Sequence, residues 1–242
     1  MTAIRIDNLT KRYRDVVAVD GLSLSIEEGE LFSLLGVNGA GKTTTIKMLS
    51  CLAEPTSGDA YLFEKSICRD TAEVKSIIAV SPQETAVAFG LSVLENLELM
   101  CGVHGFKKDK RGAKIKELTE LLGLEGVINR KVGKLSGGWQ RRLSIAMALI
   151  SEPKILFLDE PTLGLDVIAR SDLWDIILAL KGKVTIVLTT HYMEEAKALS
   201  DRVAIMKEGR LLVCDTPQNI KKAAQTDNFE QAFIRTVQGV NV

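Results

Sequence analysis

The segment that most constrains the fold of this 242-residue chain is a glycine-rich stretch that follows an apolar run. Residues 31–35 read LFSLL, and residues 36–43 read GVNGAGKT, which fits the pattern G-x-x-x-x-G-K-[ST]. In such a segment the glycines allow backbone N–H groups to turn inward around phosphate oxygens, and the helix that follows directs its positive end toward them. The pattern therefore predicts a strand, a nucleotide-binding loop and a helix, in preference to an ordinary glycine-rich turn.

Two side chains at the end of this loop have the chemistry that a bound nucleotide requires. Lys42 can place a positive charge beside the β- and γ-phosphates, and the hydroxyl of Thr43 can ligate Mg²⁺. The predicted nucleotide-binding positions of the segment are Gly36, Val37, Asn38, Gly39, Ala40, Gly41, Lys42, Thr43 and Thr44.

A second candidate site lies where two acidic residues follow another apolar run. Residues 155–158 read ILFL and are followed by Asp159 and Glu160. Ligands of open α/β sheets bind at the carboxyl ends of the strands. There Asp159 can hold Mg²⁺ through water, and Glu160 can orient or deprotonate an attacking water. An acidic turn after a core strand is the alternative, and it is the weaker one beside a phosphate loop.

The remaining hydrophobic pattern predicts an α/β core with a helical insertion. Residues 18–26 and 31–35 flank a glycine-containing turn, which predicts a hairpin. Helical periodicity extends from about residue 84 to 150. The apolar runs 155–158 and 184–188 enclose an amphipathic helix, which predicts a βαβ unit in a parallel sheet. Residues 202–206 and 210–214 predict a closing hairpin.

Composition limits the classes of function. The 31 Lys and Arg residues equal the 31 Asp and Glu residues, which argues against a broad surface for nucleic acid. The four cysteines are far apart, as expected for free thiols in a reducing cytoplasm. No signal-peptide pattern is present at the N-terminus, and the apolar runs are far shorter than the roughly 20 residues that cross a bilayer. We therefore expect a soluble chain, which a partner holds at a membrane if it acts there.

A third motif makes the resemblance to a family specific. Residues 135–138 read LSGG and closely precede Asp159, and this order resembles the signature of the ATP-binding cassette (ABC) ATPases. The resemblance covers about residues 2 to 220. It implies that Tyr13 stacks on adenine, that Gln83 senses Mg²⁺ and the attacking water, that Gly164, Leu165 and Asp166 cross a dimer interface, and that His191 contacts the γ-phosphate. Taken singly, Tyr13, Gln83 and His191 would be ordinary structural residues.

The resemblance also implies the architecture and the cofactors. It implies a phosphate-loop NTPase core with a mainly parallel sheet, an N-terminal antiparallel β subdomain and an inserted helical subdomain. We expect one ABC ATPase domain over residues 1–242, with its core at about 1–83 and 150–220, the insertion at about 84–149 and a tail at 221–242. The implied cofactors are ATP and Mg²⁺, the metal being held by Thr43, Gln83 and Asp159.

In this family two cassettes enclose two ATP molecules. Each site combines the lysine loop of one subunit with the signature of the other, here Leu135, Ser136, Gly137 and Gly138. The family usually has glutamine after the two glycines, where this chain has Trp139. The Ser136 hydroxyl and the backbone N–H groups remain available, so we interpret Trp139 as a packing variation that affects rate and partner fit.

The resemblance implies a transporter subunit. Residues 190–196 and 226–233 look most like the drug, antibiotic and sodium export branch. The expected partners are a second ABC ATPase subunit, identical or different, and a polytopic membrane permease. No nucleic acid is expected. The chain would then be cytoplasmic, peripheral on the inner face of the membrane through its permease, and the transported substrate does not touch it.

Two alternatives stay open. A soluble ABC ATPase that acts on ribosomes or DNA usually carries a second cassette, a long coiled coil or a basic arm, and this sequence has none of them. A regulatory module that binds nucleotide without hydrolysis would not need Glu160 and His191, and both residues are present.

Overall fold

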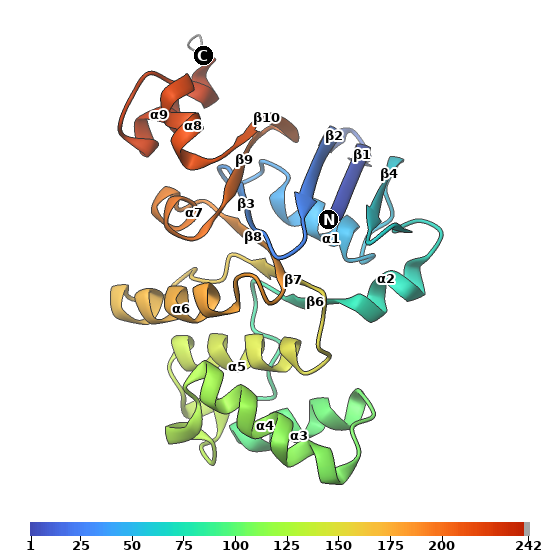
Figure 1. Ribbon diagram of the computed structural model, residues 1–242, viewed down its shortest axis with the longest axis vertical. Helices are drawn as coiled ribbons and strands as arrows, with labels where there is room; N and C mark the ends of the chain where they lie inside the picture. The colour runs from blue at the N-terminus through green and yellow to red at the C-terminus, as the bar shows by residue number, and fades with distance from the viewer. Residues whose placement is uncertain (240–242) are drawn as a thin grey trace.

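The computed structural model describes residues 1–239, which form two β-sheets with helices around them (Figure 1). The smaller sheet has the strand order β2-β1-β4-β5, and the larger sheet has the order β10-β9-β3-β8-β7-β6. The smaller sheet is antiparallel and comprises β1 (Thr2–Tyr13), β2 (Val16–Glu27), β4 (Ser57–Leu62) and β5 (Lys65–Ser66).

The larger sheet is parallel except at one edge. Its strands are β3 (Leu31–Leu35), β6 (Ile78–Ser81), β7 (Ile155–Asp159), β8 (Thr185–Thr190), β9 (Arg202–Lys207) and β10 (Arg210–Asp215), and β10 joins β9 antiparallel. Every residue of β3, β7 and β8 is buried. Both faces of these strands are covered, so their sequences read as continuous apolar runs.

The two faces of the central strand β7 belong to two different cores. Leu156 and Leu158 of β7 pack in the core that includes the central helices. Phe157, between them, packs instead in the core beneath the antiparallel sheet. Successive strand residues point to opposite faces, so each central strand stabilises both cores at once.

Most of the helices surround the larger sheet. They are α1 (Lys42–Leu49), α2 (Thr71–Ile77), α6 (Val167–Leu180), α7 (Met193–Leu199), α8 (Pro217–Ala223) and α9 (Phe229–Gln238). Three more, α3 (Val93–Val103), α4 (Lys108–Leu122) and α5 (Gly137–Leu149), lie together at the end of the molecule away from the antiparallel sheet (Figure 1). Two 3-10 turns, Glu125–Val127 and Val132–Lys134, connect α4 to α5. Within residues 1–239, no helix has the length and apolar character needed to cross a membrane.

One sequence prediction about the first sheet is wrong. Strands β2 and β3 do not form a hairpin, because β2 pairs with β1 whereas β3 pairs with β8 and β9. The turn between them carries the chain from one sheet to the other, and the Gly29 N–H in that turn donates to the Thr185 hydroxyl at 3.0 Å. A strand as completely buried as β3 needs neighbours on both edges and cover on both faces. The predicted α/β class, the parallel β7–β8 pair and the closing β9–β10 hairpin are confirmed.

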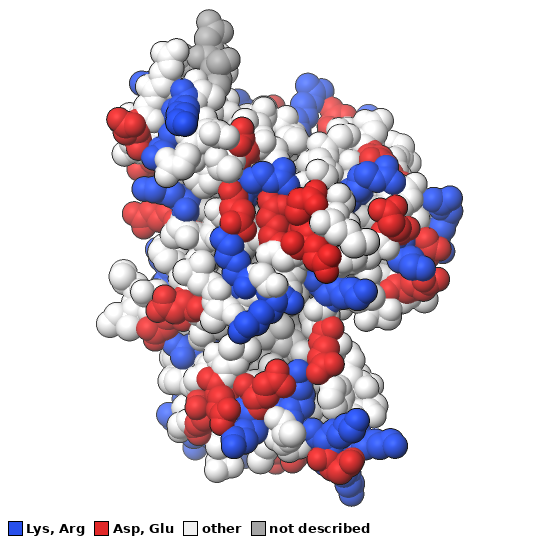
Figure 2. Space-filling view, in the orientation of Figure 1, with Lys and Arg blue, Asp and Glu red and all other residues white. Residues whose placement is uncertain are grey.

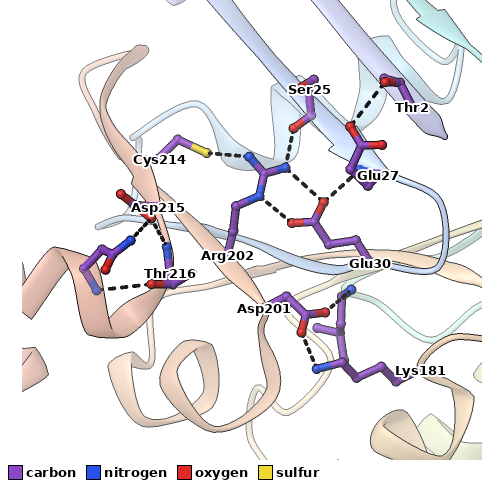
Figure 3. A network of polar contacts seen from close by, with 12 residues as sticks. Thr2, Ser25, Glu27, Glu30, Lys181, Asp201, Arg202, Cys214, Asp215 and Thr216 are labelled. Atoms are coloured by element: carbon purple, nitrogen blue, oxygen red, sulfur yellow. Dashed lines mark hydrogen bonds and ion pairs between the residues drawn. The ribbon is translucent and has the colours of Figure 1, made fainter.

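A polar network joins the two sheets at the start of β9 (Figure 3). Arg202 donates through Nε to Glu30 Oε1 at 2.7 Å and through a terminal nitrogen to the Ser25 carbonyl at 2.7 Å. Ser25 belongs to β2, so Arg202 fixes the antiparallel sheet to the parallel one. The hydrogen bond to Glu30 raises the pKa of Arg202 and keeps its charge.

Candidate nucleotide site

The glycine-rich loop connects β3 directly to α1. Gly39 and Gly41 have positive φ angles of 82° and 100°, which side chains rarely adopt. A Cβ atom at Gly36 would lie 2.5 Å from the Met206 carbonyl oxygen, and one at Gly41 would lie 2.5 Å from the Ala18 carbonyl oxygen. Both positions therefore require glycine for space, and Gly41 also for its conformation.

The first side chain of α1 bends back over this loop. Lys42 is buried, and its Nζ donates to the carbonyl oxygen of Gly36 at 2.7 Å and lies 3.4 Å from that of Val37. The same Nζ lies 3.3 Å from Glu160 Oε1. Two buried opposite charges compensate each other, and neither would be stable there alone.

A set of oxygen atoms lies beside the lysine at the end of β7. The Thr43 hydroxyl donates to Asp159 Oδ1 at 3.0 Å, and the Thr189 hydroxyl donates to the same oxygen at 2.6 Å. Asp159 and Thr189 face each other in the parallel pairing of β7 with β8. Carboxylate and hydroxyl oxygens are the ligands that Mg²⁺ prefers, so Thr43 and Asp159 fit this metal.

Glu160 is held on both carboxylate oxygens. Oε1 pairs with Lys42, and Oε2 lies 2.8 Å from Nδ1 of His191 at the end of β8. The backbone of Glu160 has a φ of 48°, and its N–H donates to the Thr189 hydroxyl at 3.0 Å. A non-glycine residue in the left-handed region costs about 1–3 kcal/mol and persists only where its surroundings hold it. Here the strained backbone directs the carboxylate back toward the loop.

Among these groups, Lys42, Thr43, Glu160 and His191 line one open cavity of about 760 Å³, whereas Gly36, Val37, Asp159 and Thr189 do not. Its lining comprises Val16, Val17, Ala18, Asn38, Gly39, Ala40, Gly41, Lys42, Thr43, Thr44, Gln83, Glu160, Leu163, His191 and Glu208. Tyr13 is outside this lining; it lies half exposed at the end of β1, with its strand partner Val16 at the cavity wall. Tyr13 is therefore placed beside the cavity and not in it.

The signature segment lies elsewhere on the molecule. Ser136 precedes the first residue of α5, and its side chain makes no capping bond. Gly137 lines a second cavity, of about 400 Å³, together with Gly164, Leu165 and Gln83. The structure thus brings the signature close to the predicted dimer loop, whereas this segment does not line the cavity of its own phosphate loop.

The other signature residues have structural contacts. Leu135 is buried in the core, and Gly138 is so close to α6 that a Cβ would lie 3.1 Å from the Ala169 side chain. Asp166 caps α6 by accepting from the Ala169 N–H at 2.9 Å. Trp139 is partly buried against the core, and the Arg142 guanidinium lies 4.8 Å from its ring centre. The tryptophan therefore packs along α5, and the Ser136 hydroxyl makes no capping hydrogen bond to this helix.

Sequence reasoning missed three polar residues around this site. Thr189 bonds Asp159, as described above. Arg141 on α5 donates to the carbonyl oxygens of Pro82 and Gln83 at 2.6 and 2.5 Å. Glu195 on α7 is fully buried, and burial raises the pKa of its carboxyl group. A threonine that ends an apolar run, as Thr189 does, was a visible signal, whereas nothing local to Arg141 or Glu195 indicated a contact.

Comparisons with known proteins identify relatives of the chain. The family described as ABC transporter matches residues 19–163. The chain is 38% identical over 230 residues to the daunorubicin resistance ATP-binding protein DrrA3 of Streptomyces coeruleorubidus, covering 95% of this chain and 73% of that protein. It is 42% identical over 212 residues to the Nod factor export ATP-binding protein I of Burkholderia orbicola, covering 87% of this chain and 69% of that protein.

Larger proteins and solved structures are also similar. The chain is 41% identical over 226 residues, 92% of its length, to the human phospholipid-transporting ATPase ABCA3, but it spans only 13% of that protein. The ATP-binding cassette MJ0796, solved as a post-hydrolysis dimer bound to ADP and Pi, superposes with a TM-score of 0.78 at 28% identity, covering 88% of this chain and 98% of that one.

A phosphate loop that faces a glutamate and a histidine at the strand ends, with a signature helix on another surface, defines an ATPase of the cassette class. The chain belongs to the ABC transporter family. Several of its relatives have names that refer to drug resistance or export, so the predicted resemblance to the export branch is confirmed.

Proposed function

We propose that this chain binds ATP with Mg²⁺ and hydrolyses it, and that Glu160 is the group that polarises the attacking water. The observation that carries the proposal is the position of this carboxylate between Lys42 and His191, in the cavity of the phosphate loop. A general base needs to lie within reach of the water from which it accepts a proton.

Binding of ATP changes the partner of Lys42. The β- and γ-phosphates take the place of Glu160 beside Nζ, which frees Oε1 of the carboxylate for water. The water oxygen then bonds to the γ-phosphorus, the bond from that phosphorus to the bridging oxygen breaks, and the proton of the water passes to Glu160. The products are ADP and inorganic phosphate, and His191 continues to orient the carboxylate through Oε2.

Thr43 and Asp159 would hold Mg²⁺, and the exposed Gln83 is the third expected ligand. Bound Mg²⁺ neutralises charge on the β- and γ-phosphate oxygens. The Thr189 hydroxyl keeps Asp159 in place for this task through its own hydrogen bond.

A second copy of the cassette completes the site. Ser136 and Gly137 are exposed at the start of α5, where helix N–H groups suit the γ-phosphate of a nucleotide held by a partner. Beside the dimer loop, Val167 and Ile168 are 79% and 74% exposed. Large apolar side chains that are exposed next to each other indicate a contact surface.

We infer that ATP hydrolysis is coupled to transport, because relatives of the chain are named for drug resistance and export. We propose that the chain drives export through a separate polytopic permease and lies peripherally on the inner face of the membrane. Phe89, Leu99 and Val103, each more than half exposed on the helical insertion, are available for that partner. On the face shown in Figure 2, acidic and basic side chains are interspersed, in keeping with the equal charge counts and unlike a nucleic-acid surface.

Phosphate release by the purified chain tests this function. Turnover with ATP and Mg²⁺ should rise per chain as the chain concentration rises, because two cassettes form each site, and EDTA should stop it. Turnover per chain that does not depend on concentration would contradict the dimer. Affinity capture from detergent-solubilised membranes should recover a polytopic membrane protein, and recovery of ribosomes or DNA instead would contradict the transport role.

A further inference from the structure

One face of α5 is bonded to the segment that ends in Gln83. Arg141 and Ser144 lie three residues apart on the helix and so share a face. Arg141 donates through its two terminal nitrogens to the carbonyl oxygens of Pro82 and Gln83, at 2.6 and 2.5 Å. The Ser144 and Ser81 hydroxyls lie 3.0 Å apart in a hydrogen bond. Three consecutive residues, 81–83, are therefore attached to a single helix.

The Arg141 contact is buried. The residue is only 5% exposed, and burial lowers the pKa of its guanidinium, an effect that the negative charge of Asp159 opposes. A buried guanidinium is unfavourable unless its donors are satisfied, and hydrogen bonds to a charged group are stronger than those between neutral groups. The two carbonyls and the guanidinium therefore hold each other in one geometry, which a single exposed bond would not do.

The position of this contact connects two functional segments. α5 begins immediately after Ser136, so Arg141 lies little more than one turn from the signature. At the other end of this contact, Gln83 lines the cavity of the phosphate loop together with Lys42 and Glu160. Gln83, Gly137 and Arg141 also share the lining of the smaller cavity. Arg141 thus connects the helix that begins at the signature directly to the residue that lines the chain's own phosphate-loop cavity.

We propose that Arg141 is a positioning residue that fixes Gln83 to the signature helix. Its two hydrogen bonds fix the backbone of Pro82 and Gln83, and so fix the position from which the Gln83 side chain meets the cavity of the phosphate loop. This inference rests on the proposed function, and it adds a residue that acts on the nucleotide site through Gln83.

A double-mutant cycle between Arg141 and Gln83 tests the proposal. Arg141→Met removes the guanidinium donors and keeps an apolar stem in the buried space. We expect unchanged ATP affinity of the monomer and a fall in turnover of about 10²-fold, the scale of a small misplacement near reacting groups. Gln83→Ala should cause a similar fall, and the double variant should be no slower than Gln83→Ala. Independent, multiplied losses would overturn the proposal, because Arg141 would then act by another route.

A neighbouring arginine provides the matched control. Arg142 lies on the same helix but pairs with Asp172 at 2.7 Å and stacks on Trp139, with no bond to residues 81–83 in the described structure. Arg142→Met should keep turnover within about twofold of the wild type. If Arg141→Met does not fold, as judged by circular dichroism, the same cycle with Arg141→Lys tests the proposal. Lysine keeps the charge but cannot donate to both carbonyl oxygens in the geometry of the guanidinium. A wild-type chain without ATPase activity would refute the proposed function itself, which is a separate result.

Discussion

The carboxylate of Glu160 lies 2.8 Å from Nδ1 of His191, and the two residues directly follow the neighbouring parallel strands β7 and β8. The remaining carboxylate oxygen contacts Lys42 at 3.3 Å. In this structure the lysine, which a phosphate would attract, is neutralised by the residue that we propose to activate water. Competition between ATP and Glu160 for Lys42 therefore couples nucleotide binding to release of the base.

Lys42→Ala should abolish ATP binding or nearly do so. The β- and γ-phosphates lose the one cation that the loop provides, and Glu160 stays buried with His191 as its remaining partner. Equilibrium binding of a fluorescent ATP analogue measures the first effect, and thermal unfolding should show a lower midpoint as well. Wild-type affinity in this variant would refute the assignment of the phosphate loop.

Ser136→Arg should leave ATP binding by the monomer intact and stop hydrolysis. Ser136 is exposed at the start of α5 and does not line the cavity of its own phosphate loop. In the proposed dimer, a bulky cation at this position blocks closure against the partner. Binding and steady-state turnover should be measured on the same sample. Normal turnover would show that the chain works as a monomer.

Glu195→Gln should change how stability depends on pH. Glu195 accepts from Trp174 Nε1 at 3.2 Å through Oε1, while Oε2 has no hydrogen-bond partner among residues 1–239. Burial raises the pKa of the carboxyl group above its ordinary 4.5, so the folded state favours the protonated form. That contribution to stability is fully present below pH 4.5 and is lost as the pH rises through the raised pKa.

Glutamine keeps the shape and cannot ionise. Relative to the variant, the wild type should therefore lose stability as the pH rises above 4.5, reaching a deficit of about 1–3 kcal/mol, the usual cost of a buried unsatisfied group. Urea unfolding of both proteins across this pH range measures the difference. A difference that stays constant with pH would show that Glu195 does not titrate in this way.

Much of the α/β core could be predicted because its signals are local. The apolar run 31–35 ends at the phosphate loop, and the apolar run 155–158 ends at Asp159, so both segments could be predicted as buried strands. The order of the strands could not be predicted, because β3 lies between β8 and β9, which come more than 150 residues later in the chain. The predicted hairpin of residues 18–26 and 31–35 was wrong because two strands that are close in the sequence need not pair with each other.

In the candidate site, too, local sequence patterns predict some residues, whereas contacts between distant segments could not be predicted. Lys42, Asp159 and Glu160 follow strand patterns, and residues at the carboxyl ends of parallel strands meet at one edge of the sheet. The contact from Arg141 to Gln83 joins residues 58 positions apart through a backbone carbonyl, and a carbonyl has no residue-specific signal. The tie between Thr189 and Asp159 depends on the register of two parallel strands, which periodicity alone does not determine.

Glu160→Gln tests the catalytic assignment most directly. The amide keeps the shape of the side chain but cannot accept a proton from water, and a positioned base commonly contributes roughly 10²–10⁴-fold in rate. Thr43 and Asp159 are unchanged, so ATP should bind at least as well as before, while turnover should fall by at least that order. Phosphate release from the variant at a rate near that of the wild type would refute the role of Glu160.

The same variant should also trap the dimer. With the γ-phosphate intact, two chains should stay joined around two ATP molecules, because in the proposed dimer each Ser136 contacts the nucleotide of the other chain. Size-exclusion chromatography with ATP and Mg²⁺ should show a dimer for Glu160→Gln and mainly a monomer for the wild type. ADP lacks the γ-phosphate, which in the proposed dimer meets the signature, so it should not support the dimer. A slow variant that remains monomeric with ATP would keep Glu160 catalytic and would indicate that the natural partner is a different cassette.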